Sequence, residues 1–526
     1  MDGVQQERKA SRFVIAGAFW LLLIGGLAVA YRYWWAPRKE AELEDSTSSK
    51  AACKTTVRIR LDGFSGYAVY RSPAMKELLR DQGICLKLED DKADYSARMQ
   101  ALRDDEADLA VFTVDSQLKA GMRFGDKMPA TVVMVTDQTR GADAVVAYAS
   151  GLSRLEDLNH PDARFVFTPN SPSEFLARII VGQLSLPRLP EKWYKEADGA
   201  EDVLKKLRAA DPKQRYAYVL WEPQLSQALK IKGVKQLFGS NQCNNCVVDV
   251  LVASRKFLAD KPDVVRAVVE NYFRALHSYT SSPNGIADLL SEDAKALGAP
   301  LAPDELKRLV NGIEFKGVMD NYVHFGLAPA MQGVQPLDDI FEYVGSILVR
   351  TSAIPSNLYK GQANRLYYDA IVGALHKEGF HPGKKQELVS GFGPGAGDLA
   401  AAHAVEELPV LPDAEWAKLS PVGTMRVPPI GFRRGTAEIS ELSSADLDAL
   451  AQQVGSLSAY YIRVIGEARQ EGDAAANAQL ASERAASVVA YLSSKGIGAS
   501  RLKPETAKAS ADGTAEVSFV LLQKSY

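Results

Sequence analysis

The residues Val464-Ile-Gly-Glu-Ala-Arg469 open the stretch that decides the fold of the C-terminal part of this 526-residue chain. Residues typical of a tight turn and then of a helix follow them, namely Gly472, Asp473, Asn477, Leu480, Arg484 and Ala485. A short apolar run followed by apolar residues at helical spacing indicates a strand and then a helix. We therefore expect a strand over residues 460–465 and a helix over residues 474–494.

The residues on either side extend this pair into a small α/β domain. Before it we expect a strand over residues 427–432 and a helix over residues 440–457. After it we expect a closing strand over residues 515–522. The predicted domain spans residues 425–526, and strands that alternate with helices indicate a sheet covered by helices.

This domain resembles the OmpA-like peptidoglycan-binding domain. That family's pattern is a strand ending in Gly-His-Thr-Asp, then a Gly, an Asn and Leu-Ser-x-x-Arg-Ala-x-x-Val on a helix. Pro429-Ile-Gly-Phe432 and Lys495-Gly-Ile497 fit the family's first strand and closing turn. In the family an aspartate holds the ammonium, and a helix arginine the carboxylate, of a stem-peptide amino acid. The resemblance gives the arginine role to Arg484, a loop-orienting role to Asn477, and a location facing a bacterial cell wall.

One position departs from the family pattern, because Arg469 stands where the family places its aspartate. An arginine cannot accept a hydrogen bond from an ammonium group, and it repels one. Two readings remain open: Glu467, Glu471 or Asp473 supplies the missing anion, or Arg469 and Arg484 together hold another anionic group. A scaffold domain without a ligand is the third.

The composition is that of an ordinary globular protein, and the length indicates more than one domain. Apolar residues make up 46% and charged residues 24%, and the net charge is −3, so no basic surplus favours nucleic acid as a partner. A chain of 526 residues exceeds a single core. Over residues 55–350, short apolar runs alternate with amphipathic helices, which indicates α/β structure with a mainly parallel sheet.

This middle region resembles the periplasmic solute-binding proteins of the nitrate, sulfonate, taurine and thiamine-precursor group. The resemblance is carried by the order of Gly141-Ala-Asp-Ala-Val-Val-Ala147, Ser171-Pro-Ser-Glu-Phe175, Ala217-Tyr-Val-Leu-Trp221-Glu-Pro223 and Leu251-Val-Ala-Ser-Arg-Lys-Phe-Leu258. It implies a type II fold, in which two α/β lobes close on a small ligand like a clam shell. Residues 351–424 would follow as a helical extension and linker.

Candidate ligand contacts are the polar residues at strand ends and helix starts, where ligands meet α/β folds. They are Asp62, Ser65, Thr113, Asp115, Arg140, Asp143, Thr168, Ser171, Trp221 and Glu222. Structural interpretations compete with these: Asp62, Asp115 and Ser171 as helix caps, Trp221 as core, and Arg140 in an ion pair with Asp143.

The charge balance among these candidates bears on the ligand. Asp62, Asp115, Asp143 and Glu222 are carboxylates, against the single guanidinium of Arg140. A sulfonate or nitrate ion needs hydrogen-bond donors and positive charge. We therefore favour a cationic or neutral amine-like solute.

The N-terminal segment is not globular. Residues 13–30 carry no charge, and at ~1.5 Å per residue they span about 27 Å, close to a bilayer core. Basic residues precede the run and aromatic residues follow it, which predicts a short cytoplasmic tail (1–12), an inner-membrane anchor (13–35), a linker (36–54) and a periplasmic remainder. A cleaved signal peptide is the alternative, with Ala28-Val-Ala30 as its site.

Four cysteines fit this oxidising compartment. Cys53 and Cys85 begin two expected strands that would be neighbours in a sheet, so we expect a disulfide between them. Cys243-Asn-Asn-Cys246 predicts a local disulfide in a loop, and a catalytic dithiol is the less favoured reading. No second ligand pair for zinc lies nearby in the sequence, so we expect no metal and no cofactor.

No motif indicates an enzyme, because the six histidines are scattered and the sequence contains no metalloprotease, nucleophile-elbow or P-loop pattern. The sequence therefore predicts an anchored envelope sensor or tether with peptidoglycan, a small solute and membrane-protein partners. Two alternatives remain: a wall-anchored binding component of an ABC importer, and a structural tether with a degenerate ligand site.

Overall fold

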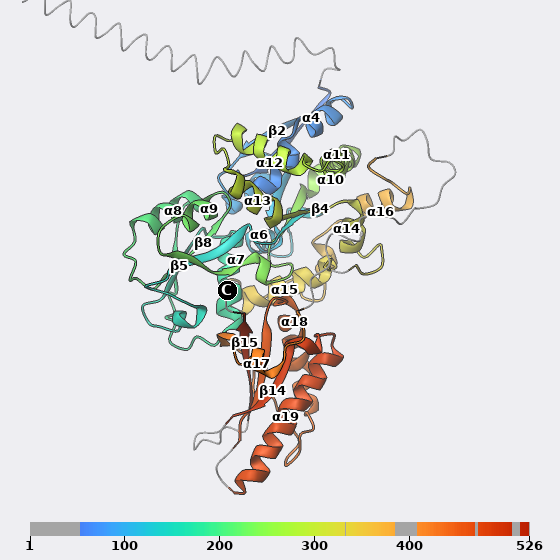
Figure 1. Cartoon of the computed structure of the whole chain (residues 1–526). Coiled ribbons are helices and arrows are strands. Elements are labelled where there is room, and N and C mark those ends of the chain that lie inside the picture. Colours follow the sequence, from blue (N-terminus) through green and yellow to red (C-terminus); the bar gives the residue numbers. More distant parts are fainter. Residues whose placement is uncertain (1–52, 332, 384–407, 469–471, 508–515, 525–526) are drawn as a thin grey trace, which may run out of the picture. The chain divides into compact units, whose positions relative to one another are not determined.

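The computed structural model describes residues 53–331, 333–383, 408–468, 472–507 and 516–524 (Figure 1). The predicted membrane anchor, with its flanking tail and most of its linker, lies outside these residues. Within the described ranges, no helix has both the length and the apolar character needed to span a bilayer. The described chain divides into a small unit, which includes residues 53–56 and 79–85, and a large unit with all the rest.

The small unit contains a disulfide between Cys53 and Cys85, with an S–S distance of 1.80 Å and 5.7 Å between the Cα atoms. The backbone N–H groups of Lys54 and Thr55 both donate to the Gly83 carbonyl, at 2.7 and 3.1 Å. Gly83 has a φ of 74°, a left-handed conformation that suits glycine in this turn.

The first lobe is built on a six-stranded sheet in the order β11-β4-β10-β3-β1-β2. Its strands are β1 (Thr55–Leu61), β2 (Ile84–Asp90), β3 (Leu109–Thr113), β4 (Ala130–Thr139), β10 (Val248–Ser254) and β11 (Ile313–Phe315). The expectation of a mainly parallel sheet is only partly correct. β1 and β3 are parallel, but β10 runs antiparallel to both β3 and β4, because the chain re-enters this sheet from the other lobe.

The second lobe is built on a five-stranded sheet in the order β7-β6-β8-β5-β9. Its strands are β5 (Asp143–Tyr148), β6 (Arg164–Phe167), β7 (Tyr194–Glu196), β8 (Tyr216–Trp221) and β9 (Val234–Gly239). Helices α8 (Gly199–Ala209) and α9 (Gln224–Leu229) pack on this sheet through Val203, Leu207 and Leu225, all of which are fully buried (Figure 1). Sheet residues such as Val146 and Leu220 complete this core.

The chain crosses between the two lobes twice, at residues 140–142 and at residues 240–247. This confirms the predicted two-lobe architecture. The remaining helices of the two lobes are α3 (Ala68–Arg71), α4 (Pro73–Arg80), α5 (Tyr95–Arg103), α6 (Val114–Met122), α7 (Pro172–Gln183), α10 (Arg255–Asp260), α11 (Pro262–Thr280), α12 (Gly285–Ala296), α13 (Pro303–Gly312), α14 (Val318–His324) and α15 (Leu337–Arg350).

Helix α11 illustrates how the sequence sets these elements. Pro262 stands in its first turn, where a missing N–H costs nothing. Val265, Val269, Tyr272 and Leu276 recur at spacings of three and four residues, and all are buried. One apolar face therefore holds the helix against the first lobe.

The C-terminal domain has a four-stranded sheet in the order β12-β15-β13-β14. Its elements are α17 (Asp413–Trp416), β12 (Ser420–Thr424), α18 (Ser444–Ser456), β13 (Tyr461–Gly466), α19 (Ala474–Ser494), β14 (Leu502–Thr506) and β15 (Val517–Gln523). Helix α19 begins and ends at the residues expected from the sequence. β13 is parallel to β14 and antiparallel to β15.

The strand expected over residues 427–432 is wrong. Only Phe432 makes a bridge there, to Ile439, and the edge strand is instead β12. Pro428 and Pro429 lack the N–H groups that a strand ladder needs, so this segment cannot pair along its length. The helical extension is also shorter than expected, with α16 (Ala370–Lys377) as its main described helix.

Candidate ligand-binding site

A small cavity lies where strand ends from the two lobes meet. Its lining consists mainly of carboxylates and aromatic rings: Asp62, Phe64, Tyr67, Tyr95, Thr113, Thr139, Asp143, Pro172, Trp221, Val247 and Asp249. No lysine or arginine is among these lining residues. The cavity volume is about 10 Å³, the room of one water molecule, so a larger ligand requires the lobes or side chains to move apart.

Asp62 follows β1 and is 5% exposed. Its Oδ1 accepts the backbone N–H of Phe64 at 3.0 Å, and its Oδ2 accepts Arg98 Nη2 at 2.9 Å. The Tyr95 hydroxyl donates to the same Oδ2 at 3.4 Å. These donors fix the direction of the carboxylate at the cavity wall.

Arg98 is the fully buried side chain that organises this wall. It pairs with Asp91 and Asp62, donates to the Val111 carbonyl, and lies 4.5 Å from the centre of the Tyr95 ring. A buried guanidinium is tolerated only when its donors are satisfied. Arg98 therefore positions both Asp62 and Tyr95 from outside the cavity.

Asp143 and Asp249 bring two further carboxylates to the cavity, and each is only 1% exposed. Asp249 Oδ1 accepts the Tyr67 hydroxyl at 2.6 Å. Among the described residues, no N–H group donates to Oδ2 of Asp143 or Oδ2 of Asp249, but the Thr139 hydroxyl lies beside Asp143 and the Asp137 carboxyl lies beside Asp249. Burial, with the nearby charges of Glu222 and Asp62, raises the pKa of Asp143 to about 7.

Asp137 lies directly opposite Asp249 on the neighbouring strand, and it is fully buried. Two carboxyl groups side by side cannot both ionise cheaply. Burial is the main cause that raises the pKa of Asp137 to about 7 and the pKa of Asp249 well above its usual range. The two groups therefore behave as a carboxyl pair that holds a proton near neutral pH.

The structure brings Asp62, Thr113, Asp143 and Trp221 together at the cavity, as their positions at strand ends predict. The other candidates do not line it. They are Ser65, Asp115, Arg140, Thr168, Ser171 and Glu222.

Two of these other carboxylates sit at helix starts. Glu222 accepts the backbone N–H and the hydroxyl of Ser226 at 3.0 and 2.8 Å, so it caps the start of α9. Asp115 lies in the first turn of α6, where burial raises its pKa to about 7.

Ser171 and Arg140 make structural contacts away from the cavity. Ser171 stands at the N-cap position of α7, but its hydroxyl donates to the Thr168 carbonyl at 2.6 Å and caps no N–H. Arg140 pairs with Glu314 at 2.5 Å and not with Asp143, so it does not balance the acidic cavity. Ser65 is buried in the turn after β1 and does not line the cavity.

Sequence reasoning missed the lining residues Phe64, Tyr67, Tyr95 and Asp249, together with Asp137 behind them. A signal for the two aspartates was present. Each is a carboxylate in a strand that is buried along its whole length, at Asp137 in β4 and Asp249 in β10. A charge in such a run is costly and therefore marks a site. The aromatic residues carried no comparable signal.

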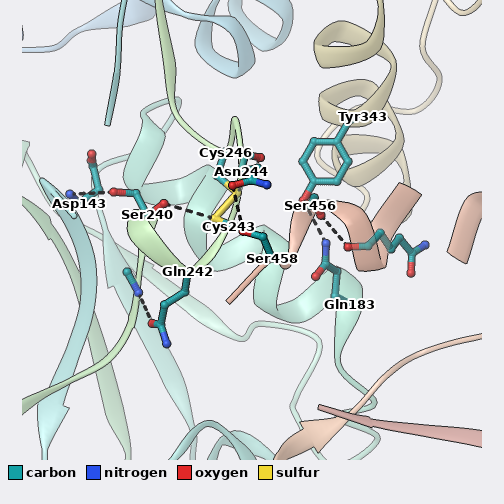
Figure 2. The surroundings of a disulfide bond; sticks show 12 residues. Asp143, Gln183, Ser240, Gln242, Cys243, Asn244, Cys246, Tyr343, Ser456 and Ser458 are labelled. Atoms are coloured by element: carbon teal, nitrogen blue, oxygen red, sulfur yellow. Dashed lines mark hydrogen bonds between the residues drawn. A yellow bond between two sulfur atoms is a disulfide. The ribbon is translucent and has the colours of Figure 1, made fainter. Parts of the chain in front are cut away.

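The second crossing segment contains a disulfide between Cys243 and Cys246, with Cα atoms 5.9 Å apart (Figure 2). The Ser240 hydroxyl beside it accepts the N–H groups of Gly141 and Asp143 at 2.7 and 3.4 Å, which ties the two crossings together. Asn244 within the loop accepts the Ser458 hydroxyl at 2.9 Å. The loop therefore contacts both the ligand-binding lobes and the C-terminal domain.

The C-terminal domain places its predicted site residues as follows. Asp473 caps α19 by accepting the N–H groups of Ala475 and Ala476 at 2.9 and 3.1 Å. Arg484 Nε donates to the Thr436 carbonyl at 3.1 Å, and its guanidinium lies 4.9 Å from the centre of the Phe432 ring.

The remaining residues expected at the peptidoglycan site lie only partly within the described ranges. Asn477 lies in the first turn of α19, and its N–H donates to the Asp473 carbonyl at 2.9 Å. Arg469 and Glu471, which decide between the open readings, lie outside the described residues. No group of three or more His, Cys, Asp or Glu side chains in the described ranges is arranged to hold a metal ion.

Comparison with known proteins identifies a family for part of the C-terminal domain. Residues 431–517 match the model of the OmpA family, within the domain expected over residues 425–526. No curated protein sequence matches the chain significantly.

Solved structures that resemble the chain include three binding proteins. The alkanesulfonate-binding protein SsuA from Xanthomonas axonopodis pv. citri, bound to MOPS, is 16% identical with a TM-score of 0.45, covering 60% of this chain and 99% of its own. The ligand-binding component of an ABC-type import system from Staphylococcus aureus, with zinc bound, is 13% identical with a TM-score of 0.45. The match covers 61% of this chain and 98% of that protein. The periplasmic nitrate-binding protein from Synechocystis is 11% identical with a TM-score of 0.43. The match covers 63% of this chain and 90% of that protein.

Proposed function

We propose that this chain is an envelope protein that binds a small solute between its two lobes and associates with peptidoglycan through its C-terminal OmpA domain. The observation that carries the proposal is the cavity between the lobes, where carboxylates with unsatisfied oxygens are buried. Leaving such atoms without partners costs free energy, so they are retained at sites that gain a partner on binding. The proposed activity is binding and not catalysis.

The charge of this cavity supports a cationic or amine-like solute. Asp62, Asp143 and Asp249 line it, and Arg140, the cationic candidate from the sequence, pairs with Glu314 and not with a lining carboxylate. An anion placed there would meet only negative or neutral groups.

Two further elements of the proposal concern location. The OmpA match supports association with peptidoglycan, with Arg484 as the expected carboxylate contact. The uncharged run over residues 13–30 supports an inner-membrane anchor, with the bulk of the chain in the periplasm. An anchored protein that contacts the wall acts as a sensor or tether in the envelope.

A physical link between the two binding functions favours the sensor role. The crossing segment over residues 240–247 must change when the lobes open or close, and Asn244 in that segment bonds to Ser456 and Ser458 of the C-terminal domain. Ligand binding thus shifts the equilibrium between open and closed lobes, and partner proteins can detect that shift. The small volume of the cavity favours a second candidate, a structural tether whose ligand site is degenerate.

A thermal-shift screen of the purified full chain separates these candidates. Amines, pyrimidines, sulfonates and phosphate would each be added in excess, because ligand at ~100 times its Kd stabilises the folded state by ~2.7 kcal/mol. A shift with any solute that is lost in Asp143→Asn supports solute binding in the cleft. No shift with any solute favours the tether, and retention on purified sacculi tests the wall contact independently.

A further inference from the structure

We infer that the solute of the cleft is a small alkylated ammonium ion that carries no carboxylate group. This inference rests on the proposed solute-binding function and specifies its ligand. Three properties of the cavity lead to it: the unsatisfied carboxylate oxygens, the aromatic walls and the lack of any cationic lining residue.

The first property defines where the positive charge sits. Oδ2 of Asp143 and Oδ2 of Asp249, one from each lobe, are buried and accept no N–H group of the described residues; their neighbours are the Thr139 hydroxyl and the Asp137 carboxyl. The third lining carboxylate, Asp62, is already engaged by Arg98 and Tyr95. A cation that enters between Asp143 and Asp249, once the lobes or side chains have moved apart to admit it, therefore pairs with one carboxylate from each lobe.

The second property defines what surrounds the charge. The rings of Phe64, Tyr67, Tyr95 and Trp221 line the same cavity, and Phe64 and Tyr67 meet edge to face with centroids 5.3 Å apart. Aromatic faces attract cations and exclude water from them. An ammonium ion with alkyl substituents suits an opened form of this site, because its substituents spread the charge over apolar surface, whereas bare ammonium loses its hydration there.

The third property excludes two other ligand classes. A zwitterion such as an amino acid or betaine would bring its carboxylate beside these aspartates, and no lysine or arginine among the lining residues offsets that repulsion. A divalent metal needs a cluster of ligands in coordination geometry, and the part of the chain that the structure describes contains none. The remaining class is an organic cation without an anionic group.

The test compares four probes of similar shape by isothermal titration calorimetry on the purified full chain. Choline is the cation, 3,3-dimethylbutan-1-ol is its neutral isostere, glycine betaine is the zwitterion, and methanesulfonate is the anion. We expect choline to bind, and the other three to bind at least about tenfold more weakly. Equal or tighter binding of the isostere or of betaine overturns the inference.

Variants locate the site. Asp249→Asn and Asp143→Asn preserve shape and are expected to weaken choline binding at least about tenfold. Asp162→Asn, which alters a loop carboxylate with 82% of its side chain exposed, is the matched control and should bind normally. Tyr67→Leu is expected to lose more affinity than Tyr67→Phe, which keeps the ring. If an Asp variant does not fold, the comparison of choline with its isostere still decides.

The outcomes also separate this inference from the proposed function. If a sulfonate or pyrimidine binds while choline does not, the ligand class is wrong and solute binding stands. If no probe and no member of the wider solute screen binds, both fail.

Discussion

The cleft between the lobes and the proposed peptidoglycan site of the C-terminal domain hold their charges in opposite ways. In the cleft, Asp143 and Asp249 are each buried with an oxygen that accepts no N–H group of the described residues. In the C-terminal domain, Arg484 is half-buried, and it already donates to the Thr436 carbonyl and covers the Phe432 ring. The cleft gains a partner of opposite charge when a cation enters, whereas the C-terminal arginine must exchange one partner for another. Charge changes should therefore have larger effects in the cleft.

The sharpest contrast is between two arginines. Arg98→Met leaves Asp62 and Asp91 buried without their cation, and we expect unfolding by urea to show a loss of about 3–5 kcal/mol. Arg484→Met, the matched change at a half-buried position, should cost less than about 1 kcal/mol. Similar losses in the two variants would remove the distinction between the regions.

The wall site gives the next largest effect. Arg484→Ala removes the expected charge-assisted bond to a stem-peptide carboxylate, which is worth about 1.5–3 kcal/mol, so retention on purified sacculi should fall about tenfold or more. Arg469→Asp restores the anion of the family pattern and should raise retention. If the native domain is retained no better than Arg484→Ala, the wall-contact proposal fails. If Arg469→Asp leaves retention unchanged, a neighbouring carboxylate already supplies the anion.

The cleft should also respond to pH, unlike the arginine site. The pKa of Asp143 and that of Asp137 are raised to about 7 in the free protein, mainly by burial. A bound cation lowers these pKa values, so binding releases protons, and affinity for an ammonium ligand should rise from pH 6 to pH 8 by up to about tenfold per unit for each proton released. Calorimetry in buffers of different ionisation enthalpy measures the released protons directly.

The same pKa shifts have the opposite consequence for the ligand-free protein. A carboxyl whose pKa is higher in the folded than in the unfolded state favours folding less as it ionises. The free energy of unfolding should therefore fall as pH rises from about 4 to about 7. In Asp143→Asn this fall should be smaller, and an unchanged fall would show that Asp143 is ionised already.

The sequence predicted the C-terminal fold more closely than the cleft, for physical reasons. Helix α19 and strand β13 carry local periodicity, so their bounds could be predicted within a residue. β14 was missed because Leu-Lys-Pro-Glu-Thr lacks an apolar pattern, and it holds only as an edge strand paired with β13. In the cleft, strand-end positions identified Asp62 and Asp143.

The rest of the cleft depends on tertiary packing that local patterns do not encode. Tyr67 and Tyr95 come from a short helical turn and from α5, and only the packing of these elements on the sheet brings their rings to Asp249 and Asp62. The sequence suggested Asp143 as a partner for Arg140, whereas the structure pairs Arg140 with Glu314, which lies far along the chain.

The smallest effect is expected at Asp473, where substitutions show whether the carboxylate caps the helix or binds a ligand. Asp473 accepts two N–H groups at the start of α19, so Asp473→Ala should cost about 1 kcal/mol of stability by urea unfolding, and Asp473→Asn or Asp473→Ser should restore most of it. If Asp473 only caps the helix, all three variants should be retained on sacculi in proportion to their folded fraction. If Asp473 instead supplies the ammonium partner that Arg469 cannot, Asp473→Asn and Asp473→Ser should keep their stability and still lose retention. Variants that preserve the cap would then lose retention on sacculi while keeping their stability, and a purely structural role does not allow that result.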